Sequence, residues 1–527
     1  MPSSFPVLVV PAVGGGLNLA LHPAHIRDDM WTGCNGFVPL DGAAEQLPTF
    51  TALGSPLAGT GDDPLGIVTD AFNDQEMLVG FEDSGELLLI RVHSTTGTPT
   101  TITRSGGTAD PVANNADVLT TGFLNGYQVL AAGIPGGAGS TSSLIRYLGG
   151  ATYDTIDPPA GEKLQAGAIV SFGAHLIAAP AMRFGTSVTA EWRRVAWSAA
   201  NNESLWLPAL SNDADDLQLD DVESPVVGVV RLGADAVGLL TRDTIYGLIP
   251  TGRIPSFTRA TLIPGVGCTL VRATTGIDAR RSGIYGALPF GAVVVASDRI
   301  YLLSGGQARP IGQPILDYFF AHGKLNPIAL PSLLRPICYH GAWRQLILPR
   351  FDEVDGECLL GEIGSDAWGR VVLGDVLGVG ARPARQAVIR TSNGLRWIFL
   401  DDDRQLWTED YTTGFPNAFI ETKDFSLEGE QAYYDDLLLE WEPLVSPTTT
   451  VEISVAARDD LPVGFGTLGR DIAPSFTVLG TLTNGASRLG LTAVPRGRFQ
   501  RFRFRTTVGR VRIRGFKLAR KAAGRRV

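Results

Sequence analysis

The sequence predicts an all-β protein: a β-propeller of about seven blades with a C-terminal β-sandwich-like domain and an extended N-terminal arm. Three observations favour this fold. A hairpin phrase recurs at multiples of about 53 residues along the chain. Glycine and proline make up about 18% of the 527 residues, above their average share of roughly 12%. Apolar segments are short, rich in β-branched residues and bounded by turn residues, as in strands.

The recurring phrase is an apolar strand, a short acidic turn and a second strand that ends in an aromatic or aliphatic residue. Two clear copies and two looser ones occupy residues 237–246, 292–301, 78–90 and 397–407. The turn acids are separated by three, one and two steps of about 53 residues: Asp83, Asp243, Asp298 and Asp403. A strand repeat of this length is typical of propeller blades, each of which is a four-stranded meander.

The repeat divides the chain into three parts. Residues 63–415 carry the repeat and form the predicted propeller, and the missing steps predict hairpins near residues 136, 189 and 355. Residues 1–62 contain Gly14–Gly16 and scattered prolines, which predict an N-terminal arm. Residues 416–527 contain longer alternating strands and predict the β-sandwich-like domain with a basic tail.

Composition limits the class of protein. The four cysteines form no Cys-x-x-Cys pair and are too few for a disulfide framework, which favours synthesis in a reducing cytoplasm. No run of about 18 apolar residues is present, so we expect no membrane span. The net charge of −10 is unevenly distributed, because residues 496–527 contain 11 Arg and 2 Lys and no acid. An acidic body with a basic C-terminus is therefore expected.

No constellation of residues predicts catalysis, a metal site or a cofactor. His22 and His25 are close in sequence, but no further ligands complete a zinc set. The acidic runs 212–221 and 401–403 lack the glycine and the distal glutamate of a calcium loop. Nucleophile-elbow and phosphate-loop motifs are absent. We therefore expect a protein that is not an enzyme, with no catalytic residues, metal or cofactor.

The C-terminal arginines form the most distinctive candidate site. Arginines alternate with phenylalanine, valine and isoleucine, so a strand would place guanidinium groups on one face and apolar groups on the other. Three interpretations of this arginine face compete. It could contact a nucleic-acid backbone, an acidic protein partner or the acidic body of a neighbouring copy of this chain. We favour a protein–protein interface. The predicted interface residues are Arg498, Arg501, Arg503, Arg505, Arg510, Arg512 and Arg514.

Several phrases resemble a known family. One pattern resembles the tail hub or nozzle proteins of short-tailed bacteriophages. It consists of Arg194-Val-Ala-Trp197-Ser198, then Trp206, then the hairpin 242–246. The phrases at 297–306 and 310–317 are similar to that family as well, and so is the opening element, which comprises Gly15-Gly16-Leu17-Asn18, Asn35 and Gly42. The chain departs from it at Gln46–Phe50, where family members often carry an Arg-x-Gly phrase.

The resemblance implies a structural virion protein of a short tail, synthesised in the host cytoplasm. Such a protein forms a sixfold ring with itself below the portal and adaptor proteins, meets other tail proteins such as fibres or a needle, and forms or closes the channel for DNA ejection. DNA would pass only transiently, since an acidic surface repels phosphates.

Two alternatives of other classes stay open. A propeller glycan hydrolase or depolymerase would need a pair of carboxylates that converge on the propeller mouth. A monomeric recognition module of the kelch or lectin type is the second alternative, because double glycines occur at 149–150 and 305–306. Kelch phrases would recur in every blade, whereas these do not.

Overall fold

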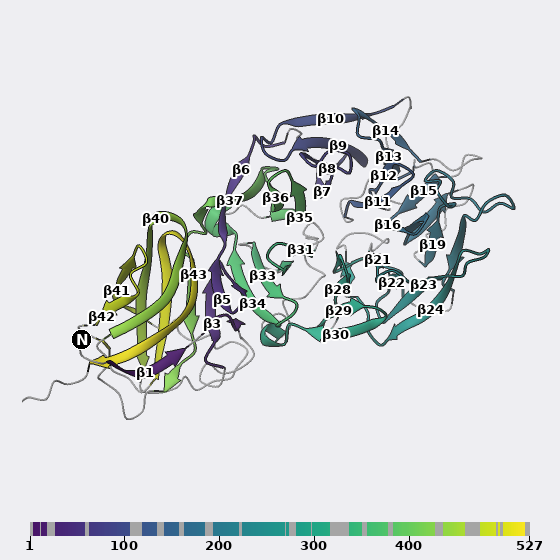
Figure 1. The fold of residues 1–527 in the computed structure, drawn as a ribbon. Helices are drawn as coiled ribbons and strands as arrows, with labels where there is room; N and C mark the ends of the chain where they lie inside the picture. The colour runs from purple at the N-terminus through teal and green to yellow at the C-terminus, as the bar shows by residue number, and fades with distance from the viewer. Residues whose placement is uncertain are drawn as a thin grey trace, which may run out of the picture.

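The structure of the chain is a computed structural model. The structure describes residues 4–10, 12–17, 27–57, 63–105, 118–133, 142–156, 163–184, 193–220, 224–268, 270–272, 281–296, 298–316, 337–349, 356–377, 383–426, 436–458, 475–491, 494–495 and 499–521. Nearly all of its regular structure is β, and a ring of blades lies beside a sandwich of long strands (Figure 1). The all-β propeller prediction is confirmed.

Seven four-stranded blades make up the ring within the described residues. From the inner to the outer strand, blade one consists of β7 (Asp63–Thr69), β8 (Glu76–Asp83), β9 (Glu86–His93) and β10 (Pro99–Arg104). Blade two consists of β11 (Thr120–Leu124), β12 (Tyr127–Ala131), β13 (Leu144–Tyr147) and β14 (Thr152–Thr155). Blade three consists of β16 (Ile169–Phe172), β17 (His175–Ala178), β19 (Arg194–Trp197) and β20 (Asp215–Gln218).

Blades four to seven follow in the same order. Blade four consists of β21 (Gly228–Arg231), β22 (Val237–Leu240), β23 (Thr244–Pro250) and β24 (Phe257–Pro264), and blade five of β27 (Tyr285–Leu288), β28 (Gly291–Val295), β29 (Ile300–Ser304) and β30 (Gln307–Ile311). Blade six consists of β31 (Cys338–His340), β32 (Gln345–Pro349), β33 (Glu357–Glu362) and β34 (Ala367–Val372). Blade seven consists of β35 (Pro383–Thr391), β36 (Gly394–Asp401), β37 (Leu406–Gly414) and β6 (Pro48–Leu53).

The predicted repeat coincides with one position in the blade. Each turn acid lies in or beside the turn between the second and third strands, in blades one, four, five and seven: Asp83, Asp243, Asp298 and Asp403. The hairpins expected near residues 136, 189 and 355 also have their flanking strands paired, in blades two, three and six. The tips of those three hairpins lie outside the described residues.

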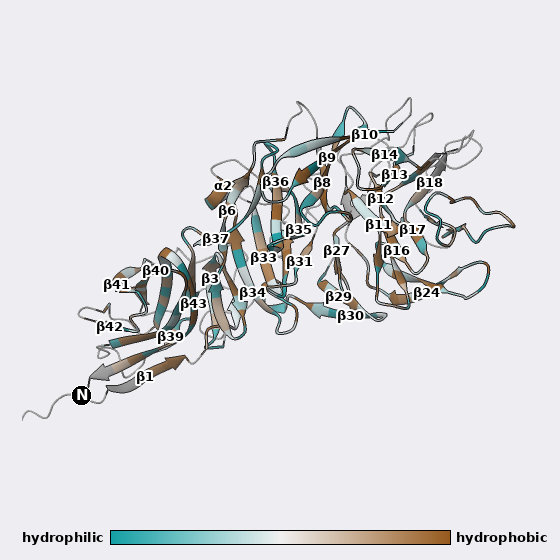
Figure 2. Cartoon of the chain, turned by 45° about the horizontal axis from the view of Figure 1, so that its top comes forward, coloured by the Kyte–Doolittle hydropathy of each residue, from teal (hydrophilic) through white to brown (hydrophobic). Residues whose placement is uncertain are grey.

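The cores of the propeller lie between neighbouring blades. The inner strands contact one another around the ring in the order β7, β11, β16, β21, β27, β31, β35 and back to β7. Apolar clusters join adjacent sheets, for example Val195 and Trp197 of blade three with Val229 and Leu239 of blade four. Outer strands such as β10 and β30 are more hydrophilic, whereas hydrophobic segments follow the strands deeper in the blades (Figure 2).

The N-terminal strand β6 closes the ring. It pairs antiparallel with β37 as the outer strand of blade seven, so this blade is built from both ends of the propeller sequence. Phe50 of β6 is buried, and its ring lies 5.1 Å from Trp397 and 5.0 Å from Phe399 of β36. Burial of this aromatic cluster stabilises the closure.

The sandwich is organised by two 23-residue strands, β40 (Asp436–Arg458) and β43 (Phe499–Lys521), which pair along most of their length. On its other side β43 pairs with several shorter strands, and β40 with two more. These strands are β1 (Ser4–Val10), β5 (Ala43–Gln46), β38 (Phe419–Thr422), β39 (Phe425–Ser426), β41 (Thr477–Thr483) and β42 (Arg488–Gly490).

Residues 1–62, expected as an arm, contribute strands to both halves. β3 (Met30–Asn35) pairs with β38, β5 pairs with β43, and β4 (Phe37–Leu40) connects β5 to the outer strand β34 of blade six. One sheet of 15 strands therefore runs from blade six into the sandwich.

The remaining elements are short. They are β2 (Gly16–Leu17), the hairpins β15 (Lys163–Ala166) with β18 (Ala181–Phe184) and β25 (Leu270–Arg272) with β26 (Arg281–Gly283), the 3-10 turn η2 (Gln313–Ile315) and the helix α2 (Gly374–Leu377). Among the described residues, no helix has the length and apolar composition needed to cross a membrane.

Candidate functional site

The C-terminal strand β43 shows the predicted alternation. Phe502 and Phe504 are fully buried, and their rings lie 5.6 Å and 5.1 Å from Phe516. The intervening arginines point to the opposite face, as the period of two along a strand requires. The sequence therefore predicted the direction of these side chains, but their partners lie far away in the chain.

Arg501 forms a buried, two-pronged ion pair with Asp424. Its Nε and Nη2 atoms donate to the two carboxylate oxygens at 2.9 and 3.1 Å. Arg501 is 5% exposed and Asp424 is 2% exposed, so water screens the pair weakly. Glu421 lies beside them, 3.7 Å from Arg501.

Arg503 and Arg505 are progressively less enclosed. Arg503 is paired with Glu421, and its guanidinium lies 3.8 Å from the centre of the Phe476 ring. Arg505 donates to the side-chain oxygen of Asn417 at 2.7 Å, on an exposed edge. Arg505 thus has a neutral partner where the other two have carboxylates.

A second arginine group contacts the N-terminal strands. Arg510 donates to Glu45 Oε1 and to the backbone oxygen of Gln46, both at 2.8 Å. Burial lowers the pKa of Arg510, and the neighbouring Glu45 opposes that shift. Arg512 is paired with the same Glu45 and lies 3.3 Å from Glu442, which also accepts from Arg514 at 3.1 Å.

Apart from Arg505, the described arginines therefore form two groups that are neutralised within the chain, instead of one free basic face. The acids that neutralise them belong to β38, to the segment after it, to β5 and to β40. Glu421 and Asp424, three residues apart, were a possible sequence signal, but the pairing of β38 with β43, which brings these acids to the arginines, was not predicted. Arg498 lies outside the described residues, and the interface role of all seven arginines stays a prediction.

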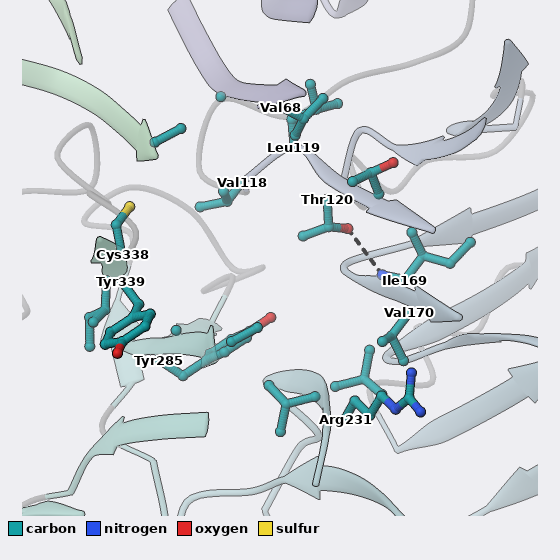
Figure 3. A pocket seen from close by; sticks show the side chains of 18 of the residues that line it. Val68, Val118, Leu119, Thr120, Ile169, Val170, Arg231, Tyr285, Cys338 and Tyr339 are labelled. Carbon is teal, nitrogen blue, oxygen red and sulfur yellow. Dashed lines mark hydrogen bonds between the residues drawn. The ribbon is translucent and has the colours of Figure 1, made fainter. Parts of the chain in front are cut away.

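A cavity of about 430 Å³ lies at the centre of the propeller (Figure 3). All seven inner strands contribute to its wall, which is mostly valine, isoleucine, leucine and alanine. Tyr285 and Tyr339 add aromatic rings, and the hydroxyl of Thr120 on the wall accepts a hydrogen bond from the Ile169 amide at 3.0 Å. Arg231 is the only charged side chain among the described lining residues.

Polar clusters elsewhere have structural partners. Asp401 accepts hydrogen bonds from the Gln405 amide and from Trp407 Nε1, both at 2.8 Å, so it organises its own turn. Burial raises the pKa of Asp401, and these two hydrogen bonds oppose the shift. No group of three metal-ligating side chains occurs among the residues that the structure describes.

The residues of the family resemblance also have structural roles. Trp197 and Trp206 are buried, and their indole nitrogens donate to backbone oxygens at 3.0 and 2.8 Å. Arg194 pairs with Asp216 of the neighbouring strand at 2.8 Å. These three side chains hold blade three together.

The N-terminal residues of the resemblance contact blade six. Asn35 accepts from the Val372 amide at 3.0 Å and donates to Asp375 at 2.6 Å. Gly16 has a φ of 77°, and a Cβ there would lie 2.4 Å from the Trp368 nitrogen, so only glycine fits. Asn35 therefore binds the N-terminal segment to the propeller through hydrogen bonds, and Gly16 allows that segment to lie close to the Trp368 backbone.

Comparisons with known proteins give no family assignment. No protein-family model matches the chain, and no curated protein matches it. Among solved structures, it is similar to virginiamycin B lyase from Staphylococcus aureus, with a TM-score of 0.40 and 11% identity over 68% of this chain and 98% of that one. It is also similar to YCF48 from Cyanidioschyzon merolae, with a TM-score of 0.36, 11% identity and the same coverage.

Proposed function

We propose that this chain is a structural subunit of a short bacteriophage tail, which assembles as a sixfold nozzle or hub ring below the portal and adaptor proteins. In that position it forms or closes the channel through which DNA is ejected. Other tail proteins, such as fibres or a needle, attach to the same ring, and the protein acts without catalysis or a cofactor.

The observation that carries the proposal is the continuous sheet from blade six through β4 and β5 to β43. Arg510 and Arg512 reinforce it, because both pair with Glu45 where the sheet passes between the two halves. A wall subunit must transmit force between neighbours without its domains separating, and a shared sheet with buried ion pairs meets that need. Two of the residues that resemble the nozzle family, Gly16 and Asn35, lie beside this junction, where the N-terminal segment meets blade six.

The lining of the axial cavity favours a structural role over glycan hydrolysis. A hydrolase needs two carboxylates about 5–10 Å apart at the substrate, and no Asp or Glu is among the described residues that line the cavity. Release of reducing ends from host polysaccharide by the purified protein would instead support the hydrolase.

The proposal is tested by labelling virions with gold-conjugated antibody against this chain and averaging negative-stain images of the isolated protein. Label at a single vertex, together with sixfold rings, is the expected result. Label over the whole capsid shell, or none on the particles, would overturn the proposal.

The arginine prediction has its own test in the same particles. Arg505 is the best candidate for an external contact, because Asn417 leaves its charge unneutralised. Arg505→Ser should reduce incorporation into particles, whereas Lys517→Ser, at an exposed position of the same strand, should not. Equal incorporation of both variants would remove Arg505 from the interface.

A further inference from the structure

We infer that the axial cavity of the propeller binds a small amphiphilic anion, with an apolar body and one terminal carboxylate. The inference does not depend on the tail role, since it rests on the walls of the cavity alone. Its volume of about 430 Å³ lies within the range of roughly 300–1,000 Å³ that is usual for small-molecule sites.

The walls favour an apolar body. Val68, Val118, Val170 and Val388 line the cavity from four different blades, and each is only half-buried in the described structure. Figure 3 shows Val118 and Val170 on its walls, with Tyr285 and Tyr339 on another side. An apolar ligand would remove this surface from water, which is favourable in proportion to the area covered.

The charge at the wall favours an anion. Arg231 ends the inner strand β21, is exposed and lies beside Val170 (Figure 3). Its Nε atom donates to the Gly233 oxygen at 2.8 Å, which fixes the base of the guanidinium. No carboxylate of the described residues forms an ion pair with Arg231, although the chain as a whole has a net charge of −10.

These features together select the ligand class. A cationic amphiphile would meet the Arg231 charge with no acid on the described wall to balance it. A sugar would leave its hydroxyl groups against valine side chains, at a cost in unmade hydrogen bonds. A carboxylate can accept from the outer nitrogens of Arg231, since guanidinium groups bind carboxylates with paired hydrogen bonds.

The experiment uses the full chain and three probes of equal chain length. Decanoate and decyltrimethylammonium are used below their micellar concentrations, and decanol below its solubility limit. Isothermal titration should give one decanoate site and weaker binding of the other two. Arg231→Gln should weaken decanoate binding about tenfold, as expected for a lost charge-assisted hydrogen bond, and leave decanol binding unchanged. Arg242→Gln, at an exposed turn of the same blade, is the matched control and should have no effect.

Two further variants place the site within the cavity. Val388→Trp and Val118→Trp fill it from different blades, and each variant that keeps the wild-type circular dichroism spectrum should lose both decanoate and decanol. The inference is overturned if the wild-type protein binds no decanoate, if the cation binds as tightly as the anion, or if Arg231→Gln and Arg242→Gln weaken binding equally. Retention of decanoate by a folded, cavity-filled variant would also overturn it.

Discussion

Arg510 Nη2 lies 2.8 Å from Glu45 Oε1, and this buried contact joins two residues that are 465 positions apart. Both residues are less than 10% exposed. Through it the N-terminal strand β5 is tied to the C-terminal strand β43 at the place where the sandwich continues into the propeller. The ion pair therefore belongs to neither half alone.

Glu45→Ala should lower the free energy of unfolding by about 3 kcal/mol, because Arg510 would be left buried with no carboxylate. Urea denaturation followed by circular dichroism measures the change. Glu440→Ala, at an exposed position of β40, is the control and should stay within about 0.5 kcal/mol of the wild type. Equal, small effects of both variants would show that the pair contributes nothing to stability.

Arg501→Leu and Arg505→Leu should differ sharply in stability. Arg501→Leu breaks the two-pronged ion pair with the buried Asp424 and should cost about 3–5 kcal/mol. Arg505→Leu removes a hydrogen bond to Asn417 at an exposed edge and should cost less than about 1 kcal/mol. Parallel denaturation curves of the two variants check this difference, and a reversed order would contradict the assigned pairing.

Phe50→Ala should weaken the closure of the ring. It removes a buried ring that packs on Trp397 and Phe399, so we expect a loss of about 3–5 kcal/mol. Thr51→Ala, the next residue on β6 with an exposed side chain, should be nearly neutral. Hydrogen exchange by mass spectrometry should show faster exchange in β37 for Phe50→Ala, while unchanged protection there would argue against the closing role of β6.

Glu203 should make stability depend on acid pH. Burial raises the pKa of Glu203, but hydrogen bonds from its own backbone, Asn125, Ser204 and Arg146 outweigh that effect and leave the pKa below its ordinary value of 4.5. A carboxyl whose folded pKa is depressed stabilises the protein above its unfolded pKa, and this contribution is lost as the pH falls through the folded value. Melting temperatures of Glu203→Gln should therefore fall less than those of the wild type between about pH 5 and pH 3. Parallel pH profiles would refute this role.

The fold could be predicted because its local signal repeats. Asp83, Asp243, Asp298 and Asp403 occupy equivalent turns, so their spacing revealed the blade without any knowledge of distant contacts. The pairing of Glu45 with Arg510 had no such signal, since strand pairing between the two ends of a chain depends on the completed fold. The same applies to the axial cavity, whose wall takes residues from seven separate strands, each of which looks in the sequence like an ordinary apolar strand.

The position of β6 has a consequence for biosynthesis. Gln405 donates a hydrogen bond to the backbone oxygen of Leu53, and 352 residues separate the two. At a synthesis rate of 5–20 residues per second, β6 leaves the ribosome roughly 20–70 s before its partner β37. During this interval an early-emerging strand waits with an unpaired edge, and blade seven is the last to form although its outer strand is among the first residues translated.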